Sequence, residues 1–78
     1  MARYEIFVTY KNGIFDPPGA TAERALANLG YEGVESVQIG KYIRLAGDVD
    51  LATVTEVCEK LLANPVIEDF RVETVEEA

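Results

Sequence analysis

The first stretch of the chain that alternates between apolar and polar residues covers residues 3–11. One side of an extended backbone there carries Tyr4, Ile6, Val8 and Tyr10. A period of two is typical of a β-strand with one buried face. Phe7 interrupts the polar side, which indicates that the second face of this strand is covered as well.

A helical pattern follows a turn at Lys11-Asn12-Gly13. The segment Asp16-Pro17-Pro18-Gly19 predicts the helix start, because Asp can cap a first turn in which Pro is tolerated. Gly30 predicts a left-handed stop after Leu29. The apolar stripe of this helix consists of Ala22, Ala25, Leu26 and Leu29.

Two extended stretches, 34–40 and 41–46, come next. We expect Val37 and Ile39 to face inward from the first, and Ile43 and Leu45 from the second. Gly40-Lys41 is the predicted hairpin tip between them, because Gly supplies the positive φ that tight primed turns require.

A second helix is predicted after Gly47, with Asp48 or Asp50 as its cap. Asn64-Pro65 ends it, since the residue before Pro leaves the α region and Pro cannot donate a hydrogen bond. The apolar face of this helix consists of Leu51, Val54, Cys58, Leu61 and Leu62. A last strand follows with Phe70 and Val72 in alternation with polar residues, and residues 76–78 are expected to be frayed.

The expected order is therefore β-α-β-β-α-β. We predict one small α+β domain over residues 1–78, an antiparallel sheet with both helices on one face, as in the ferredoxin-like order. A chain of 78 residues buries only about 60% of the surface that its unfolded form exposes. With such a thin core, we expect a homodimer or higher homo-oligomer, or a subunit of a larger assembly.

Charge narrows the choice of partners. The formal net charge is −7, and the acidic excess lies in residues 46–78, which hold nine acidic and two basic side chains. Nucleic-acid affinity depends on Lys and Arg at phosphates, so we expect neither nucleic acid nor an anionic membrane as a partner. The sequence shows no signal peptide and no apolar run of membrane length. The lone Cys58 suggests a reducing compartment, and we expect a cytoplasmic protein.

Residues for catalysis are scarce. The chain has no histidine, the usual group for proton transfer near neutral pH. Cys58 lies on an apolar stripe, the carboxylates lack calcium-loop spacing, and the glycines match no nucleotide-binding fingerprint. We therefore expect no catalytic, cofactor-binding or metal-binding residue on this chain. Lys11, Lys41 and Arg44 form either a solvated sheet edge or a docking surface for an acidic partner.

Four blocks of sequence occur in an order and at separations that together resemble one family. They are 11–19 (KNGIFDPPG), 30–31 (GY), 37–43 (VQIGKYI) and 58–69 (CEKLLANPVIED). The chain resembles the PurS family, the small subunit of phosphoribosylformylglycinamidine synthase, over nearly its whole length. Two positions depart from the usual pattern, Asn12 where Pro is common and Pro18 where Gln is common. Both substitutes suit turns.

The resemblance implies a non-catalytic subunit of an ATP-dependent, glutamine-using ligase of de novo purine (IMP) biosynthesis. In that family a large synthetase subunit uses ATP and Mg, and a glutaminase subunit supplies ammonia. Together they convert formylglycinamide ribonucleotide, glutamine and ATP into formylglycinamidine ribonucleotide, glutamate, ADP and phosphate. The small subunit is expected to dimerise, to bridge the other two and to support ammonia transfer by holding their sites close together.

We assign inter-subunit contact to the loop after the first strand, to the expected hairpin tip and to the junction before the last strand. The residues are Lys11, Asn12, Gly13, Asp16, Pro17, Gly19, Gly40, Lys41, Tyr42, Asn64 and Pro65. Phe7 and Tyr42 are the expected homo-oligomer face.

Two other functions stay open at this point. An ACT-like regulatory dimer shares the same element order and binds small molecules near its first loop, where Gly13 lies, and fold alone does not separate the two. A stand-alone enzyme that relies on a single carboxylate is the second alternative.

Overall fold

The fold is built on a three-stranded antiparallel sheet. The structure is a computed structural model that describes residues 1–75, so the expected fraying of 76–78 lies outside the described residues. The strands are β1 (Ala2–Tyr10), β2 (Lys41–Gly47) and β3 (Glu68–Val75), in the order β2-β1-β3. The helices are α1 (Pro17–Asn28) and α2 (Leu51–Val57), and α2 continues into a π-helical turn, Cys58–Leu62.

Strand β1 is the central strand, and it carries the alternation seen in the sequence. It pairs with β2 through Ile6↔Ile43 and with β3 through Ile6↔Val72. Tyr4, Ile6 and Val8 are buried on one face. The last strand therefore pairs within its own chain.

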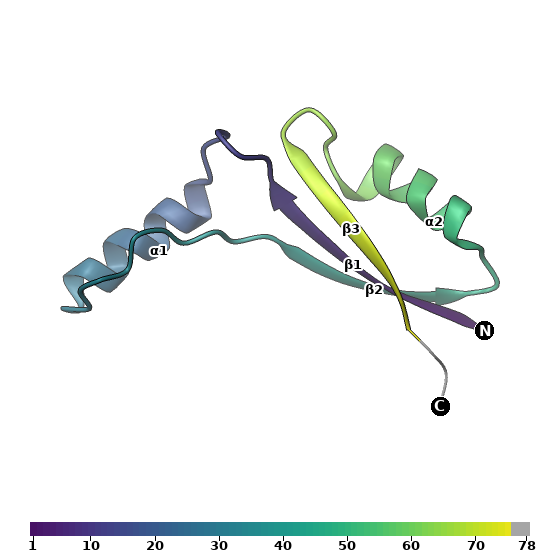
Figure 1. Cartoon of the computed structure of the whole chain (residues 1–78), viewed down its shortest axis with the longest axis horizontal. Coiled ribbons are helices and arrows are strands. Elements are labelled where there is room, and N and C mark those ends of the chain that lie inside the picture. The colour runs from purple at the N-terminus through teal and green to yellow at the C-terminus, as the bar shows by residue number, and fades with distance from the viewer. Residues whose placement is uncertain (76–78) are drawn as a thin grey trace.

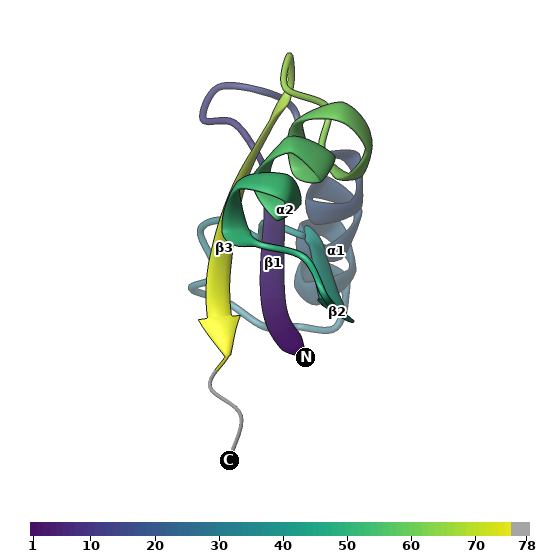
Figure 2. The same ribbon diagram turned by 90° about the vertical axis from the view of Figure 1, so that its right-hand side faces the viewer.

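Helix α2 and its π turn cover the inner face of the sheet (Figures 1 and 2). Val54 and Cys58, which lie one helical turn apart, are buried against the β1 side chains. The Tyr4 hydroxyl donates to the carbonyl of Val49 at 2.8 Å, which fixes the segment leading into α2. Burial of Cys58 confirms the packing role predicted for it.

Both predicted helix starts are confirmed. The Asp16 carboxylate accepts a hydrogen bond from the Gly19 amide at 2.9 Å, and Asp50, rather than Asp48, accepts one from the Thr53 amide at 2.8 Å. These bonds satisfy amide groups that have no partner inside the helix. Gly30, with φ +90°, follows α1 as the predicted left-handed stop.

The junction at Asn64-Pro65 also ends the second helix as predicted. The last turn widens, so that the Ala63 amide bonds the Cys58 carbonyl five residues back. The Asn64 carbonyl then accepts from the amides of Ile67 and Glu68, which returns the chain into β3.

The predicted hairpin at Gly40-Lys41 is wrong. Residues 34–40 form no strand of the sheet, and the chain runs on from them directly into β2 (Figure 1). Gly40 does not adopt a positive φ. Its role is steric, because a Cβ atom there would lie 2.1 Å from the Val8 carbonyl oxygen. Glycine is needed here because two backbone segments lie close together. A glycine after an extended run can indicate such a close approach as well as a turn.

The expectation that both helices cover one face of a four-stranded sheet is wrong as well. Helix α1 lies beside the 34–40 segment, away from the sheet (Figure 1). We call residues 12–40 the arm. The Cα radius of gyration is 15.8 Å, against about 12 Å for a compact chain of this length. Since no hairpin folds back at Gly40, α1 is not brought over the sheet.

Removal of two methyl groups from the core should be costly. Val54 is 1% exposed and Val66 is 76% exposed. We expect Val54→Ala to lower the free energy of unfolding by about 2 kcal/mol, and Val66→Ala, the matched control, to change it by less than about 0.5 kcal/mol. Urea unfolding measures both, and equal effects of the two variants would contradict this core.

Acid should weaken the α2 cap. Hydrogen bonds from Thr53 lower the pKa of the Asp50 carboxyl. A lowered folded-state pKa gives stability that is present at neutral pH and is lost as pH falls below about 4. Asp50→Asn should therefore flatten the fall in stability at acid pH. Asp48→Asn removes the same charge from a carboxylate that bonds no described residue, and it should keep the wild-type slope in pH-dependent thermal unfolding.

The stability of the fold should depend on glycine at position 40 but not on glycine at position 47. A Cβ atom at Gly47 meets nothing within 4 Å. We expect Gly40→Ala to destabilise the fold by about 2 kcal/mol through its contact with Val8, and Gly47→Ala to be neutral within about 0.5 kcal/mol. Chemical denaturation of the pair checks this, and a neutral Gly40→Ala would refute the close approach.

Candidate functional site

The arm is held together by carboxylates that bond backbone amides. The second oxygen of Asp16 accepts from the Ile39 amide at 2.8 Å, and Glu23 accepts from the Val37 amide at 3.1 Å. A Cβ atom at Gly19 would lie 2.2 Å from the Val37 carbonyl oxygen. Helix α1 therefore lies directly against the extended segment, and Asp16 links the cap of α1 to that segment.

The predicted contact residues fall into three places. Lys11-Asn12-Gly13 follows β1, Gly40 precedes β2, which begins at Lys41, and Asn64-Pro65 precedes β3. The antiparallel sheet therefore brings these segments to one end, which we call the loop end. Asp16, Pro17 and Gly19 lie at the start of α1. Tyr42 lies on the opposite face of the sheet from α2, opposite Phe7 on β1.

Both lysines of the loop end have partners. The Lys11 ammonium forms an ion pair with Asp69 at 2.9 Å, and the Lys41 ammonium donates to the Leu62 carbonyl at 2.7 Å. The second contact fixes the end of the π turn against the start of β2. Because both pairs are exposed, they order the loop end more than they stabilise it.

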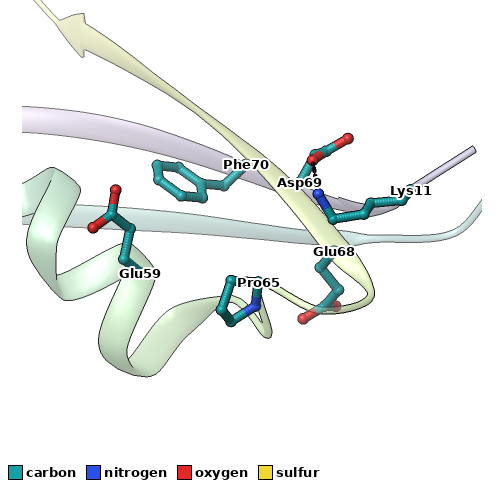
Figure 3. Close-up of a pocket in the computed structure, with 6 residues that line it drawn as sticks. All are labelled: Lys11, Glu59, Pro65, Glu68, Asp69 and Phe70. Carbon is teal, nitrogen blue, oxygen red and sulfur yellow. Dashed lines mark hydrogen bonds and ion pairs between the residues drawn. The ribbon is translucent and has the colours of Figure 1, made fainter.

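An open hollow of about 400 Å³ lies at the loop end, between the π turn and β3 (Figure 3). In the close-up, Lys11 reaches towards Asp69 at the rim, while Glu59 and Phe70 lie at the other side. The lining residues are Lys11, Glu59, Pro65, Glu68, Asp69 and Phe70. Three carboxylates and one lysine make it acidic, so it is suited to a basic group on a partner.

The sheet face opposite α2, which we call the outer face, is centred on aromatic rings. The Phe7 and Tyr42 ring centroids lie 5.3 Å apart, and the Arg71 guanidinium lies 4.4 Å from the Phe7 centroid. Tyr42 also donates a hydrogen bond to Glu5, and that bond raises the pKa of the tyrosine hydroxyl. Phe7 is thus covered on both sides by neighbouring side chains.

Charge on the outer face is balanced, in contrast to the chain as a whole. Three arginines lie there with three carboxylates, a net charge of zero on a chain of net charge −7. They are Arg3, Arg44, Arg71, Glu5, Asp69 and Glu73. A neutral face with an aromatic centre can approach another copy of itself without the repulsion expected from the chain's net charge.

The site differs from the sequence reading in three residues. Glu23 and Arg71 were not predicted, and Asp16 has a second role in addition to capping. Only the pairing of β1 with β3 places Arg71 opposite Phe7, and only the course of residues 34–40 brings Glu23 to Val37. Neither contact can be predicted from the local periodicity of the sequence.

Groups suited to chemistry are few in the described part of the chain. Burial raises the pKa of the Cys58 thiol, which disfavours the reactive thiolate. Residues 1–75 contain no cluster of three or more His, Cys, Asp or Glu that could hold a metal ion. No helix among them has the length and hydropathy needed to span a membrane.

Comparison with known proteins gives one consistent result. The family described as PurS, phosphoribosylformylglycinamidine (FGAM) synthase, matches residues 3–76. The chain is 44% identical to the FGAM synthase subunit PurS of Bacillus subtilis, over 97% of this chain and 95% of that protein. It is 43% identical to the Synechocystis subunit PurS, over 83% of this chain and 70% of that one.

Solved structures agree with the sequence relatives. The structure of Bacillus subtilis PurS superimposes with a TM-score of 0.88 at 44% identity, covering 97% of this chain and all of that one. Methanocaldococcus jannaschii PurS, a subunit of formylglycinamide ribonucleotide amidotransferase, gives 0.85 at 34% identity and covers both chains fully. A chain in the PurLQS structure from Thermotoga maritima gives 0.78 at 32% identity, covering 95% and 96%. With nearly its whole length matched in sequence and in structure, the chain belongs to the PurS family of FGAM synthase.

Proposed function

We propose that this chain is the small, non-catalytic subunit of FGAM synthase in purine biosynthesis. The observation that carries the proposal is the end-to-end match to Bacillus subtilis PurS, over 97% of this chain and 95% of that protein. This chain therefore matches nearly the whole length of that subunit.

The proposed partners are a large synthetase subunit and a glutaminase subunit. The solved PurLQS structure of Thermotoga maritima, which contains a chain similar to this one, supports an assembly of three kinds of subunit. In the proposed division of work, ATP and Mg are used by the synthetase and ammonia is released by the glutaminase. This chain holds their sites in a fixed orientation, so that ammonia is captured before it reaches solvent.

We assign the partner contact to the loop end of the sheet. Its three segments lie at the ends of neighbouring strands of one sheet. The lysines are oriented by Asp69 and by the Leu62 carbonyl, and the acidic hollow lies beside them. A preordered surface of mixed charge loses little side-chain freedom when a partner binds.

The outer face is the proposed surface for self-association. Its charges cancel, and Tyr42 is 52% exposed beside Phe7. Two outer faces related by a two-fold axis can pair arginine of one copy with carboxylate of the other around an aromatic centre.

Reconstitution tests the proposal directly. The chain is added to its synthetase and glutaminase, and glutamine-dependent FGAM formation is measured. We expect formation to depend on the chain, and Lys11→Glu to weaken assembly by about tenfold, or 1.4 kcal/mol. Lys60→Glu makes the same charge change beside Glu56 on the helix and should act as wild type.

Two results would contradict the proposal. One is an unchanged glutamine-dependent rate when the chain is left out. The other is turnover of glutamine or ATP by the purified chain alone. Calorimetry with amino acids and nucleotides tests the ACT-like alternative, for which tight binding to the isolated chain is required.

A further inference from the structure

Two arginines of the sheet differ from every other basic side chain of the protein. Within residues 1–75, which hold all seven basic residues, the guanidinium groups of Arg3 and Arg44 form no hydrogen bond or ion pair. The other five basic side chains each have a partner, and they are Lys11, Arg24, Lys41, Lys60 and Arg71. On a chain of net charge −7, two neighbouring arginines without such a partner call for an explanation.

Both arginines line an open hollow of about 420 Å³, which we call the arginine hollow. It lies at the end of the sheet opposite the loop end, where β1 begins and where β2 and β3 finish. The N-terminus and the end of β2 lie together there (Figure 1). Arg3, Glu5, Arg44, Ala46 and Val75 are among its lining residues. A hollow of this volume is in the range of ligand sites.

The register of the sheet brings the two guanidinium groups to one place. Arg3 lies opposite Ala46 and Arg44 lies opposite Glu5, so the two arginines are diagonal neighbours on the outer face. Residues in such positions are about 7–8 Å apart, within reach of long side chains. The small side chain of Ala46 leaves room opposite Arg3. Both guanidinium groups can therefore converge on one anionic group.

The carboxylates of the outer face are already engaged by other groups. Glu5, the residue opposite Arg44, accepts a hydrogen bond from the Tyr42 hydroxyl. The other two carboxylates, Asp69 and Glu73, are held in the ion pairs of Lys11 and Arg71. The charge of the outer face is balanced as a whole, but the arginine hollow has a local excess of positive charge, with two arginines and one glutamate.

A carboxylate is the ligand chemistry that suits this hollow. The planar fork of a guanidinium group donates two parallel hydrogen bonds to the oxygens of a carboxylate or a phosphate. Because Glu5 also lines the hollow, a carboxylate with one negative charge meets less repulsion there than a phosphate with nearly two. Two arginines are too few to hold a nucleic acid on a chain of net charge −7, since that binding needs many phosphate contacts.

We propose that the arginine hollow binds an acidic segment of a partner subunit, whose carboxylates accept hydrogen bonds from Arg3 and Arg44. The inference rests on the proposed function, which supplies the partners, and deepens it. The hollow at the loop end has three carboxylates and one lysine and suits a basic group, whereas the arginine hollow at the other end of the sheet suits an acidic one. A bridge with opposite charges at its two ends disfavours the reversed arrangement of its partners, because that arrangement brings like charges together.

Removal of the two charges tests the proposal. Both side chains are exposed, so Arg3→Ala/Arg44→Ala should fold as wild type. We expect its dissociation constant for assembly with the synthetase and glutaminase to rise about tenfold at low salt, and the difference from wild type to shrink as added salt screens the charges. Arg24→Ala/Lys60→Ala is the matched control. It removes the same charge from side chains that bond neighbours one helical turn away, and it should assemble as wild type.

Titration of the chain alone gives a second measurement that needs no partner subunit. The probe is a peptide of four glutamates with blocked ends, and the readout is the NMR signal of each arginine Nε–H group. We expects the signals of Arg3 and Arg44 to shift and to saturate, and that of Arg24 to stay unchanged. Inorganic phosphate is the comparison probe and should bind more weakly than the peptide.

Each outcome decides the question. Weaker assembly of Arg3→Ala/Arg44→Ala than of its control, together with saturable peptide binding, supports the proposal. Wild-type assembly of that variant, even where its self-association is weakened, overturns it, and so does an equal loss in the control or tighter binding of phosphate than of the peptide. Peptide binding that appears only after Glu76→Gln/Glu77→Gln assigns the arginines to residues 76–77 of the chain itself and also overturns it. Failure of the wild-type chain to support glutamine-dependent synthesis would overturn the proposed function, and the peptide titration would still decide whether the hollow takes carboxylates.

Discussion

The burial of three alternating side chains of β1 under α2 is the interaction on which the rest of the structure depends. Tyr4, Ile6 and Val8 meet Val54 and Cys58 there, and these five are among the six buried apolar residues of the core cluster. Because β1 is also the central strand, the same residues fix the positions of β2 and β3. This small core therefore also fixes where the strand ends that form the loop end lie.

The arm depends on a different interaction. Its extended segment is joined to α1 by two carboxylates that accept backbone amides, and by the close approach of Gly19. The Asp16–Ile39 bond is exposed and the Glu23–Val37 bond is only partly buried, so water competes for both. An arm with several exposed apolar side chains and an open strand edge is therefore a structure that another protein surface is expected to complete.

These two parts suit the contact role proposed for this subunit. The core is small, and the surfaces outside it differ from one another in charge and in aromatic content. One is an acidic hollow with oriented lysines, one is a neutral face with an aromatic centre, and one is an open edge. A chain similar to this one occurs in the PurLQS structure of Thermotoga maritima, which is consistent with the proposed contact role of these surfaces.

Local sequence determined the elements. The alternation in β1, the caps at Asp16 and Asp50, the stop at Gly30 and the break at Asn64-Pro65 were all readable, because each depends on a few neighbouring residues. The family could also be inferred from the sequence, because its four characteristic blocks are each a short run of consecutive residues.

Only the tertiary structure decided where those elements lie. Residues 34–40 have the composition of a strand, but they do not turn back at Gly40, which instead lies close to Val8, over thirty positions away in the chain. The chain runs straight into β2, and α1 lies away from the sheet. The periodicity of the sequence predicts which face of a helix or strand is apolar. Which element packs against that face is decided by contacts between residues that are distant in the chain.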